Sequence, residues 1–206
     1  MSQRFQVHPL NPQSRLIRQA AELIREGSLI IYPTDSGYAF GWHIGNRDAA
    51  ERLQRIRQTG KDHNFTLVCR DLSEIATYAR IENPTYRLLR AHTPGAYTFI
   101  LRATREVPRR LQNPKQQTVG IRVPDHPVPL ALVAELGEPL MSSTLILPDH
   151  DQPLADPDDI WEVLSARIDL LIDSGNCGLD PTTVVDLTGD FPRVLRHGRG
   201  DASAFA

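Results

Sequence analysis

Small hydroxyl side chains, a carboxylate and a glycine follow directly on an apolar stretch near the N-terminus. Residues 28–32 read SLIIY and residues 33–38 read PTDSGY. The end of a buried strand in an α/β sheet is a common place for a ligand, so this segment is a candidate binding loop. The same residue types favour turns, and by spacing alone a plain turn explains the segment at least as well. Both interpretations stay open at this point.

A hydroxyl pair and a lone arginine are further candidates. Thr182 and Thr183 precede two valines, although threonine is also simply a good strand residue. Arg122 lies in GIRVP, between apolar neighbours. A buried guanidinium without a partner is costly, so Arg122 requires an anion close to it. That anion is a bound carboxylate or phosphate or, more plainly, an Asp or Glu of the chain itself.

Several familiar chemical signatures do not occur in the sequence. The seven histidines have neither HxH nor HExxH spacing, which makes a metal site improbable. There is no Walker motif, and residues 175–178 (GNCG) do not form a dinucleotide fingerprint. Residues 142–144 (SST) lack the GxSxG elbow of a hydrolase. The residues alone therefore predict an α/β domain with a hydroxyl-rich, arginine-containing ligand cleft.

Length and composition are those of one folded domain. The chain has 206 residues, 40% hydrophobic and 23% charged, so we expect a single domain over 1–206. No apolar run approaches the roughly 18 residues of a membrane span, and the N-terminus has no apolar signal core. We therefore expect a cytoplasmic protein without a membrane partner. Cys69 and Cys177 are expected to be free thiols.

Charge is unevenly distributed along the chain although its net value is only -2. Residues 102–115 carry five cations against one anion, and Arg52, Arg55, Arg57 and Lys61 form a second cationic stretch. Residues 149–173 carry eight anions against one arginine. Solvated faces are the plainest explanation of such runs. Two cationic stretches that met on one face would still attract phosphates, because local potential decides within a Debye length of about 8 Å.

Hydrophobic periodicity predicts helices and strands that alternate early and strands that crowd together late, which favours a mixed sheet. Asp48 with Glu51 resembles a capping box, and Asn83 before Pro84 resembles a helix start. Expected helices cover 14–26, 47–58, 73–80, 83–91 and 128–136, with one more opening at 156; expected strands cover 28–32, 65–69, 97–101, 119–123, 140–147, 170–172, 182–187 and 193–196.

Four segments occur together in a familiar order: residues 33–41 (PTDSGYAFG), 94–101 (PGAYTFIL), 120–127 (GIRVPDHP) and 182–187 (TTVVDL). With them the chain resembles the YrdC-like family from about residue 14 to 200. Residues 55–58 and 64–67 are similar to its YciO subgroup. The resemblance implies an α/β fold, with a twisted mixed sheet, flanking helices and a large, positively lined concave cavity.

The resemblance also implies an activity. YrdC members are threonylcarbamoyl-AMP synthases, which join L-threonine, bicarbonate and ATP and release pyrophosphate, for the threonylcarbamoyladenosine modification of tRNA. ATP is then a substrate with Mg²⁺ as its counterion, and neither a permanent cofactor nor a protein metal site is expected. On this mapping Thr34 and Arg122 hold threonine and bicarbonate together with Thr182 or Thr183; Thr118, Ser143, Arg196 and Arg57 meet ATP; and Arg57 and Thr144 are the catalytic candidates.

The family's synthase signature is altered here. It consists of a lysine, an arginine two residues later, and far downstream a serine and an asparagine two residues apart. Arg57, Thr59, Thr144 and Ile146 stand at these positions. Thr59 removes a cation and Ile146 removes a polar group. Loss of one cation near a charged transition state costs on the order of 10²–10³ in rate by analogy with an oxyanion donor, so we expect synthase activity to be weak or replaced.

Two other functions compete with synthesis. One is a tRNA- or double-stranded-RNA-binding protein without synthase activity, for which the cationic stretch supplies Arg102, Arg105, Arg109, Arg110 and Lys115. The other is a related carbamoyl or nucleotidyl transfer to a different acceptor, which would explain a retained cavity with altered signature residues.

Overall fold

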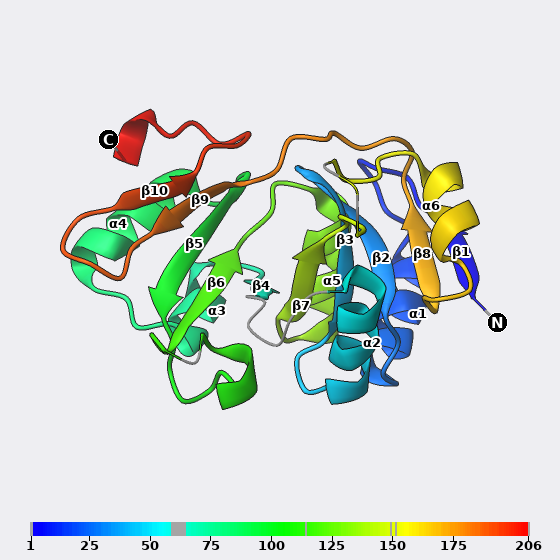
Figure 1. Cartoon of the computed structure of the whole chain (residues 1–206), viewed down its shortest axis with the longest axis horizontal. Helices are drawn as coiled ribbons and strands as arrows, with labels where there is room; N and C mark the ends of the chain where they lie inside the picture. The colour runs from blue at the N-terminus through cyan, green and yellow to red at the C-terminus, as the bar shows by residue number, and fades with distance from the viewer. Residues whose placement is uncertain (1, 59–64, 114, 149, 151, 206) are drawn as a thin grey trace.

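The computed structural model describes residues 2–58, 65–113, 115–148, 150 and 152–205, without the side chain of Arg110. Within these residues ten strands join in one mixed sheet (Figure 1). Its order is β1-β8-β2-β3-β7-β4-β6-β5-β9-β10. The strands are β1 (Gln3–Gln6), β2 (Ile30–Thr34), β3 (Gly37–His43), β4 (Thr66–Val68), β5 (Tyr97–Arg102), β6 (Thr118–Arg122), β7 (Leu140–Thr144), β8 (Leu170–Asp173), β9 (Thr183–Asp186) and β10 (Arg193–Arg196).

Local sequence signals mark one end of α5 and one end of α6. Helix α5 ends at Gly137, whose φ of 72° is the left-handed conformation that glycine tolerates. Asp156 caps α6 by accepting a hydrogen bond from the amide of Asp158. The helices are α1 (Ser14–Arg25), α2 (Arg47–Arg57), α3 (Leu72–Tyr78), α4 (Asn83–His92), α5 (Pro127–Leu136) and α6 (Pro157–Leu164), with short 3-10 turns at Arg109–Leu111 and Ser203–Phe205.

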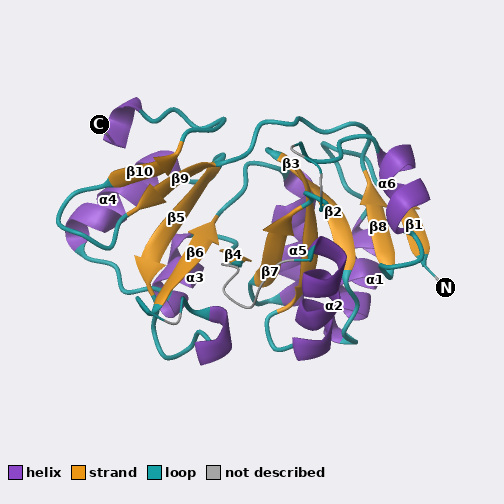
Figure 2. Cartoon of the chain, viewed as in Figure 1, coloured by secondary structure: helices purple, strands orange, loops and turns teal. Residues whose placement is uncertain are grey.

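Two hydrophobic cores lie on opposite faces of the sheet because side chains alternate along a strand. Ile30 and Tyr32 of β2 pack with α1 and α5 in one core. Ile31, between them, belongs to the other core, to which α2 and α6 contribute. The helices therefore flank the sheet on both sides (Figure 2).

The strands gather into two groups, which Figure 1 shows side by side. Strands β1, β8, β2, β3 and β7 lie on the right of that view, and β6, β5, β9 and β10 lie on the left. Residues 174–182 run between the groups along the top. β4 joins them, since it pairs with β7 on one side and β6 on the other. This division matters because side chains from both groups line the cavity described below.

The fold class and nearly all expected elements are confirmed, but four details of the prediction were wrong. Two strands, β1 and β3, were not expected. Helix α2 is capped by Asn46, whose side chain accepts from the amide of Ala49, and not by Asp48. Helix α4 begins one residue earlier than expected, since Glu82 is its cap residue and Asn83 is already helical.

Among the described residues, no helix combines the length and the apolar character needed to cross a membrane. Both cysteines are free; Cys69 is buried and Cys177 is half-buried.

Candidate functional site

A cavity of about 460 Å³ is lined by strands of both groups. Its volume falls in the range of pockets that hold a small molecule or nucleotide. Polar side chains form much of the lining: Thr34, Ser36, Arg57, Thr66, Thr98, Asn113, Gln116, Thr118, Arg122, Ser142, Ser143, Thr144, Thr182, Asp186, Arg193 and Arg196.

Strand alternation explains why one wall of the cavity is polar. Thr98 and Ile100 of β5, and Thr118, Gly120 and Arg122 of β6, are spaced by two and so share one face. Phe99 and Ile121, which alternate with them, are fully buried in the core. Arg122 is thus held at the cavity by a strand whose other face is anchored in the core.

The segment 33–38 is both a turn and part of the cavity wall. It closes the hairpin between β2 and β3, and Thr34 and Ser36 line the cavity. The Thr34 hydroxyl donates to the carbonyl of Gly37 at 2.6 Å and accepts from the amide of Ser36 at 3.1 Å. Gly37 has φ 112°, and a Cβ there would lie 2.7 Å from the carbonyl oxygen of Gly178. Only glycine fits this position. The segment is therefore a turn and a part of the ligand cavity at once, and the two interpretations of the sequence were not exclusive.

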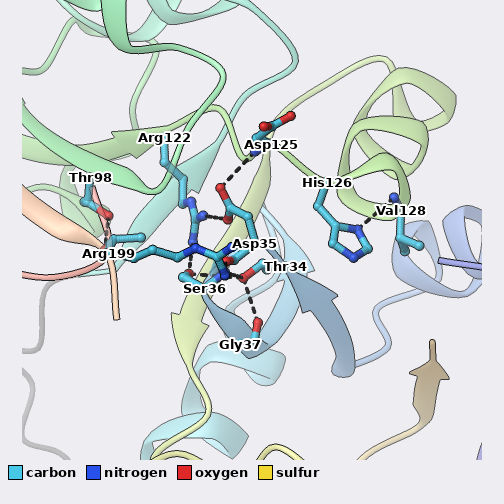
Figure 3. Close-up of polar contacts among 12 residues, drawn as sticks. Thr34, Asp35, Ser36, Gly37, Thr98, Arg122, Asp125, His126, Val128 and Arg199 are labelled. Atoms are coloured by element: carbon cyan, nitrogen blue, oxygen red, sulfur yellow. Dashed lines mark hydrogen bonds and ion pairs between the residues drawn. The ribbon is translucent and has the colours of Figure 1, made fainter. Parts of the chain in front are cut away.

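Arg122 forms a buried ion pair with Asp35 (Figure 3). The side chains of the two residues are 9% and 8% exposed. Arg122 Nη2 donates to Asp35 Oδ1, and Nη1 donates to Ser36 Oγ at 3.0 Å. Asp35 Oδ2 accepts from the amide of Asp125 at 2.9 Å. The anion that Arg122 requires is therefore present in the chain itself, which was the plainer of the two alternatives.

Arg196 and two threonine hydroxyls form a second polar group in the cavity. Arg196 Nε donates to the carbonyl of Thr182 at 3.1 Å, and Nη2 contacts Thr182 Oγ1 at 3.0 Å. The hydroxyls of Thr182 and Thr98 lie 2.9 Å apart. Among the described residues, Arg196 contacts no carboxylate, so this group presents a positive charge.

Arg57 joins the end of α2 to the segment that follows β7. Its Nε donates to the carbonyl of Ile146 at 3.0 Å, and its Nη1 donates to Ser143 Oγ. All three residues line the cavity, and Thr144 lies between the two acceptors in the sequence. The structure thus brings together three of the four signature positions; Thr59 lies outside the described residues.

The electrostatics of the cavity favour an anionic ligand. Arg57, Arg122, Arg193 and Arg196 face it, against the single carboxylate of Asp186 in the described lining. Burial lowers the pKa of Arg57. Burial, and then the nearby charge of Arg122, lower the pKa of Arg196. A bound anion would relieve this repulsion.

The described residues offer little to a metal ion. They contain no group of three or more His, Cys, Asp or Glu side chains placed to hold one. Asp186 pairs with Arg193 at 3.2 Å and accepts from Thr188. Protein sites for Mg²⁺ often supply only one or two carboxylates and leave the rest to substrate phosphates and water, so the lining fits an ion that arrives with a nucleotide better than a resident one.

Most of the expected ligand-binding residues meet in the cavity, but Thr183 does not line it. Thr183 Oγ1 donates to the carbonyl of Gly200 and accepts from the amide of Gly198, so it anchors the C-terminal segment. Of the two alternatives, Thr182 therefore lines the pocket and Thr183 does not. The residues that do line it are Thr34, Arg57, Thr118, Arg122, Ser143, Thr144, Thr182 and Arg196.

Of the residues expected to bind RNA, Arg102, Arg105, Arg109 and Lys115 lie outside the cavity lining. Arg102 is exposed and donates to the carbonyl of Thr188. Arg105, Arg109 and Lys115 are exposed in the connection between β5 and β6, and the side chain of Arg110 lies outside the description. In the second cationic stretch, Arg52 pairs with Asp169 at 2.7 Å, so part of its charge is neutralised.

Several residues that line the cavity were not among the expected site residues. Ser36 and Thr98 lie within two of the four segments that carry the family resemblance. Thr98 is two residues from Ile100, and this strand spacing predicts that the two side chains share one face. Asn113 and Gln116 lie in a loop, where no periodicity shows which way a side chain points, and Arg193 is the first residue of β10.

The sequence matches the family model Sua5_yciO_yrdC, described as "Telomere recombination", over residues 22–198. YciO of Escherichia coli strain K12 is 52% identical over 205 residues, covering 100% of both chains. Its crystal structure superimposes with a TM-score of 0.96.

Characterised relatives are more distant. The threonylcarbamoyl-AMP synthase of Bacillus subtilis is 29% identical over 88% of this chain and 53% of its own length. The P. abyssi Sua5 structure with L-threonine matches with a TM-score of 0.86 and 25% identity, over 95% of this chain and 57% of Sua5. Since the family model spans residues 22–198 and the fold agrees with that of YciO, this chain belongs to the Sua5/YciO/YrdC family.

Proposed function

We propose that this protein forms threonylcarbamoyl-AMP from L-threonine, bicarbonate and ATP, more slowly than a synthase with the full signature, and that it acts in tRNA threonylcarbamoyladenosine modification. The observation that carries the proposal is the cavity. It collects Thr34, Arg122, Thr182, Ser143 and Arg196 from segments far apart in the sequence. Homologues near 30% identity bear the name threonylcarbamoyl-AMP synthase, and Sua5 has been crystallised with L-threonine.

The proposed reaction has two steps. The threonine amino nitrogen forms a bond to the bicarbonate carbon, and water leaves, which gives a carbamate. A carbamate oxygen then attacks the α-phosphorus of ATP, the bond to the β-phosphate oxygen breaks, and pyrophosphate leaves. Holding three reactants in one cavity removes much of the entropic barrier to such a condensation.

In this scheme the arginines have separate tasks. Arg122 binds the threonine carboxylate from β6, with Ser36 beside it at 3.0 Å. Arg196 and Arg57 face the phosphates and stabilise the charge that develops as pyrophosphate leaves. Mg²⁺ would enter with ATP and neutralise phosphate charge. Thr144 would contribute a hydroxyl next to Ser143.

The altered signature supports a reduced rate. Ile146 presents an aliphatic side chain to the cavity. Its backbone carbonyl accepts from Arg57 Nε and Ser143 Oγ accepts from Nη1, so the guanidinium already donates N–H groups to the protein itself. Fewer donors then remain for the phosphates than a fully exposed cation would offer.

The test is to incubate the purified protein with ATP, bicarbonate and labelled L-threonine and to measure the mixed anhydride and pyrophosphate. Omission of bicarbonate is one control, Arg122→Ala is another, and serine and other amino acids are run in parallel. The proposal requires pyrophosphate release that depends on both threonine and bicarbonate. If ATP binds but no amino acid supports its turnover, the proposal is wrong.

A second candidate is binding of tRNA or double-stranded RNA without synthesis. The favouring observation is the exposed cationic connection between β5 and β6, where the Arg105 side chain is 95% exposed. Such a surface would bind the phosphate backbone and read little sequence. RNA affinity together with absent synthase activity would favour this candidate over the first.

A further inference from the structure

Asp35 is the point at which four segments of the chain meet, although it does not itself line the cavity. It lies in the turn between β2 and β3 and binds Arg122 of β6. It also accepts from the amide of Asp125, which precedes α5. Its backbone carbonyl accepts from Arg199 of the C-terminal segment at 2.6 Å. Figure 3 shows these groups converging on the turn.

Both carboxylate oxygens of Asp35 are committed to the protein. Oδ1 accepts from Arg122 and Oδ2 accepts from the amide of Asp125. The side chain is 8% exposed. Asp35 therefore has no oxygen directed to a ligand, whereas its neighbours Thr34 and Ser36 and its partner Arg122 all line the cavity.

The guanidinium of Arg122 is correspondingly fixed. Asp35 holds Nη2 and Ser36 holds Nη1 at 3.0 Å. Its Nε is buried and has no hydrogen-bond partner among the described residues. A guanidinium has five N–H donors, so two protein contacts leave donors over for a ligand. Without Asp35, a flexible side chain would have to be ordered each time a ligand binds, at an entropic cost.

We propose that Asp35 is a positioning residue that sets the Arg122 guanidinium for the carboxylate of an amino-acid substrate in the cavity. This inference rests on the proposed function, because it takes the threonine carboxylate as the ligand of Arg122. Asp35 also makes the pair neutral overall, which suits a single carboxylate better than a polyphosphate. The phosphates are left to the part of the cavity around Arg196, which has no such carboxylate among its described contacts.

The experiment compares L-threonine with threoninol, in which an alcohol replaces the carboxylate. The ratio of their dissociation constants, measured by calorimetry, isolates the carboxylate contact. A charge-assisted hydrogen bond predicts that the wild type favours threonine by about 10- to 100-fold. The ratio should approach one in Asp35→Ala and also in Arg122→Ala. Asp35→Glu, which keeps the negative charge, should retain part of the preference for threonine over threoninol.

A matched control exists outside the cavity lining. Asp169 also accepts from a backbone amide, that of Leu29 at 2.8 Å, and from an arginine, Arg52 at 2.7 Å. It does not line the cavity. Asp169→Ala removes the same kinds of contact and should leave the threonine-to-threoninol ratio unchanged. Asp35→Asn serves if Asp35→Ala does not fold, because one amide oxygen cannot satisfy both donors.

A second readout does not depend on a ligand. The guanidinium N–H signals of Arg122, assigned by NMR through their loss in Arg122→Ala, should exchange slowly in the wild type. In Asp35→Ala they should exchange at least about tenfold faster, because the group that fixes them is gone.

The outcomes separate the two proposals. A wild-type ratio retained in Asp35→Ala, or slow exchange retained there, overturns the positioning role while leaving the threonine site intact. If the wild type does not distinguish threonine from threoninol, the proposed function has lost its carboxylate site, and the positioning role falls with it even where the NMR signals respond to Asp35.

Discussion

Arg57 donates a hydrogen bond from Nε to the backbone carbonyl of Ile146 at 3.0 Å, which links two positions of the altered signature in the cavity lining. The contact uses the main chain of Ile146, so it does not depend on the side chain there. A polar side chain can therefore be restored at position 146 without removing the support of Arg57.

The first prediction follows from that contact. Thr59→Arg combined with Ile146→Asn should raise the initial rate of pyrophosphate release with threonine and bicarbonate. Each restored group should raise the rate by up to the order of 10²–10³-fold, by analogy with an oxyanion donor. Because Arg57 stands in place of the lysine, the rate should stay below that of a synthase with the full signature. Thr59→Arg with Ile146→Leu is the matched control and should gain less. An unchanged rate in a folded, ATP-binding double variant would mean that these positions do not limit the chemistry.

The second prediction concerns stability. Removing either Asp35 or Arg122 leaves the other as an uncompensated buried charge, which costs about 3–5 kcal/mol of unfolding free energy. The double variant Asp35→Ala/Arg122→Ala should cost less than the sum of the two single variants. Urea unfolding measures all three. The half-buried ion pair Arg52–Asp169 is the comparison, and its loss in either single variant should lower the unfolding free energy by only about 0–1 kcal/mol. If the losses from Asp35→Ala and Arg122→Ala simply add in the double variant, the two residues are not energetically coupled and the prediction is wrong.

The third prediction is a loss of stability in alkali. Burial raises the pKa of Tyr32 to about 12, and its hydroxyl lies 2.7 Å from Ser142 Oγ. Between pH 10 and 12 the unfolded chain releases this proton while the folded chain keeps it, so rising pH favours unfolding. From pH 9 to 11 the wild type should lose about 1.4 kcal/mol more than Tyr32→Phe. Urea unfolding of both proteins at both pH values decides this, and equal losses would show that Tyr32 does not titrate as described.

The fourth prediction tests the RNA-binding alternative. If RNA binds through the connection between β5 and β6, its affinity should fall steeply with salt. Charge reversal of Arg109 and Arg110 to glutamate should weaken it further. Filter binding against salt concentration measures both effects. Reversal of Arg15 and Arg18 on α1 makes the same change in net charge on another element and should matter less; an affinity indifferent to salt, or equally reduced by both reversals, would rule this surface out.

The sequence by itself determined the elements whose signals are local. Helix α1 follows from apolar residues at helical spacing, and α5 ends at Gly137 because glycine alone tolerates that backbone easily. Four ordered segments were enough to indicate the family. Strand β1 gave no such signal, since QRFQ is short and polar, and β3 was hidden by its two glycines and the turn before it.

The tertiary structure decided which side chains meet. Thr182 and Thr183 are adjacent residues of the same type, yet Thr182 lines the cavity and Thr183 donates to the carbonyl of Gly200. Strand alternation predicts that their side chains point to opposite faces. Only the packing of this segment decides which of the two faces the cavity. Asp35 and Arg122 are 87 residues apart. Local sequence showed that Arg122 needed an anion, and only the approach of the β2–β3 turn to β6 showed which one, because an ion pair depends on distance in space and not on separation along the chain.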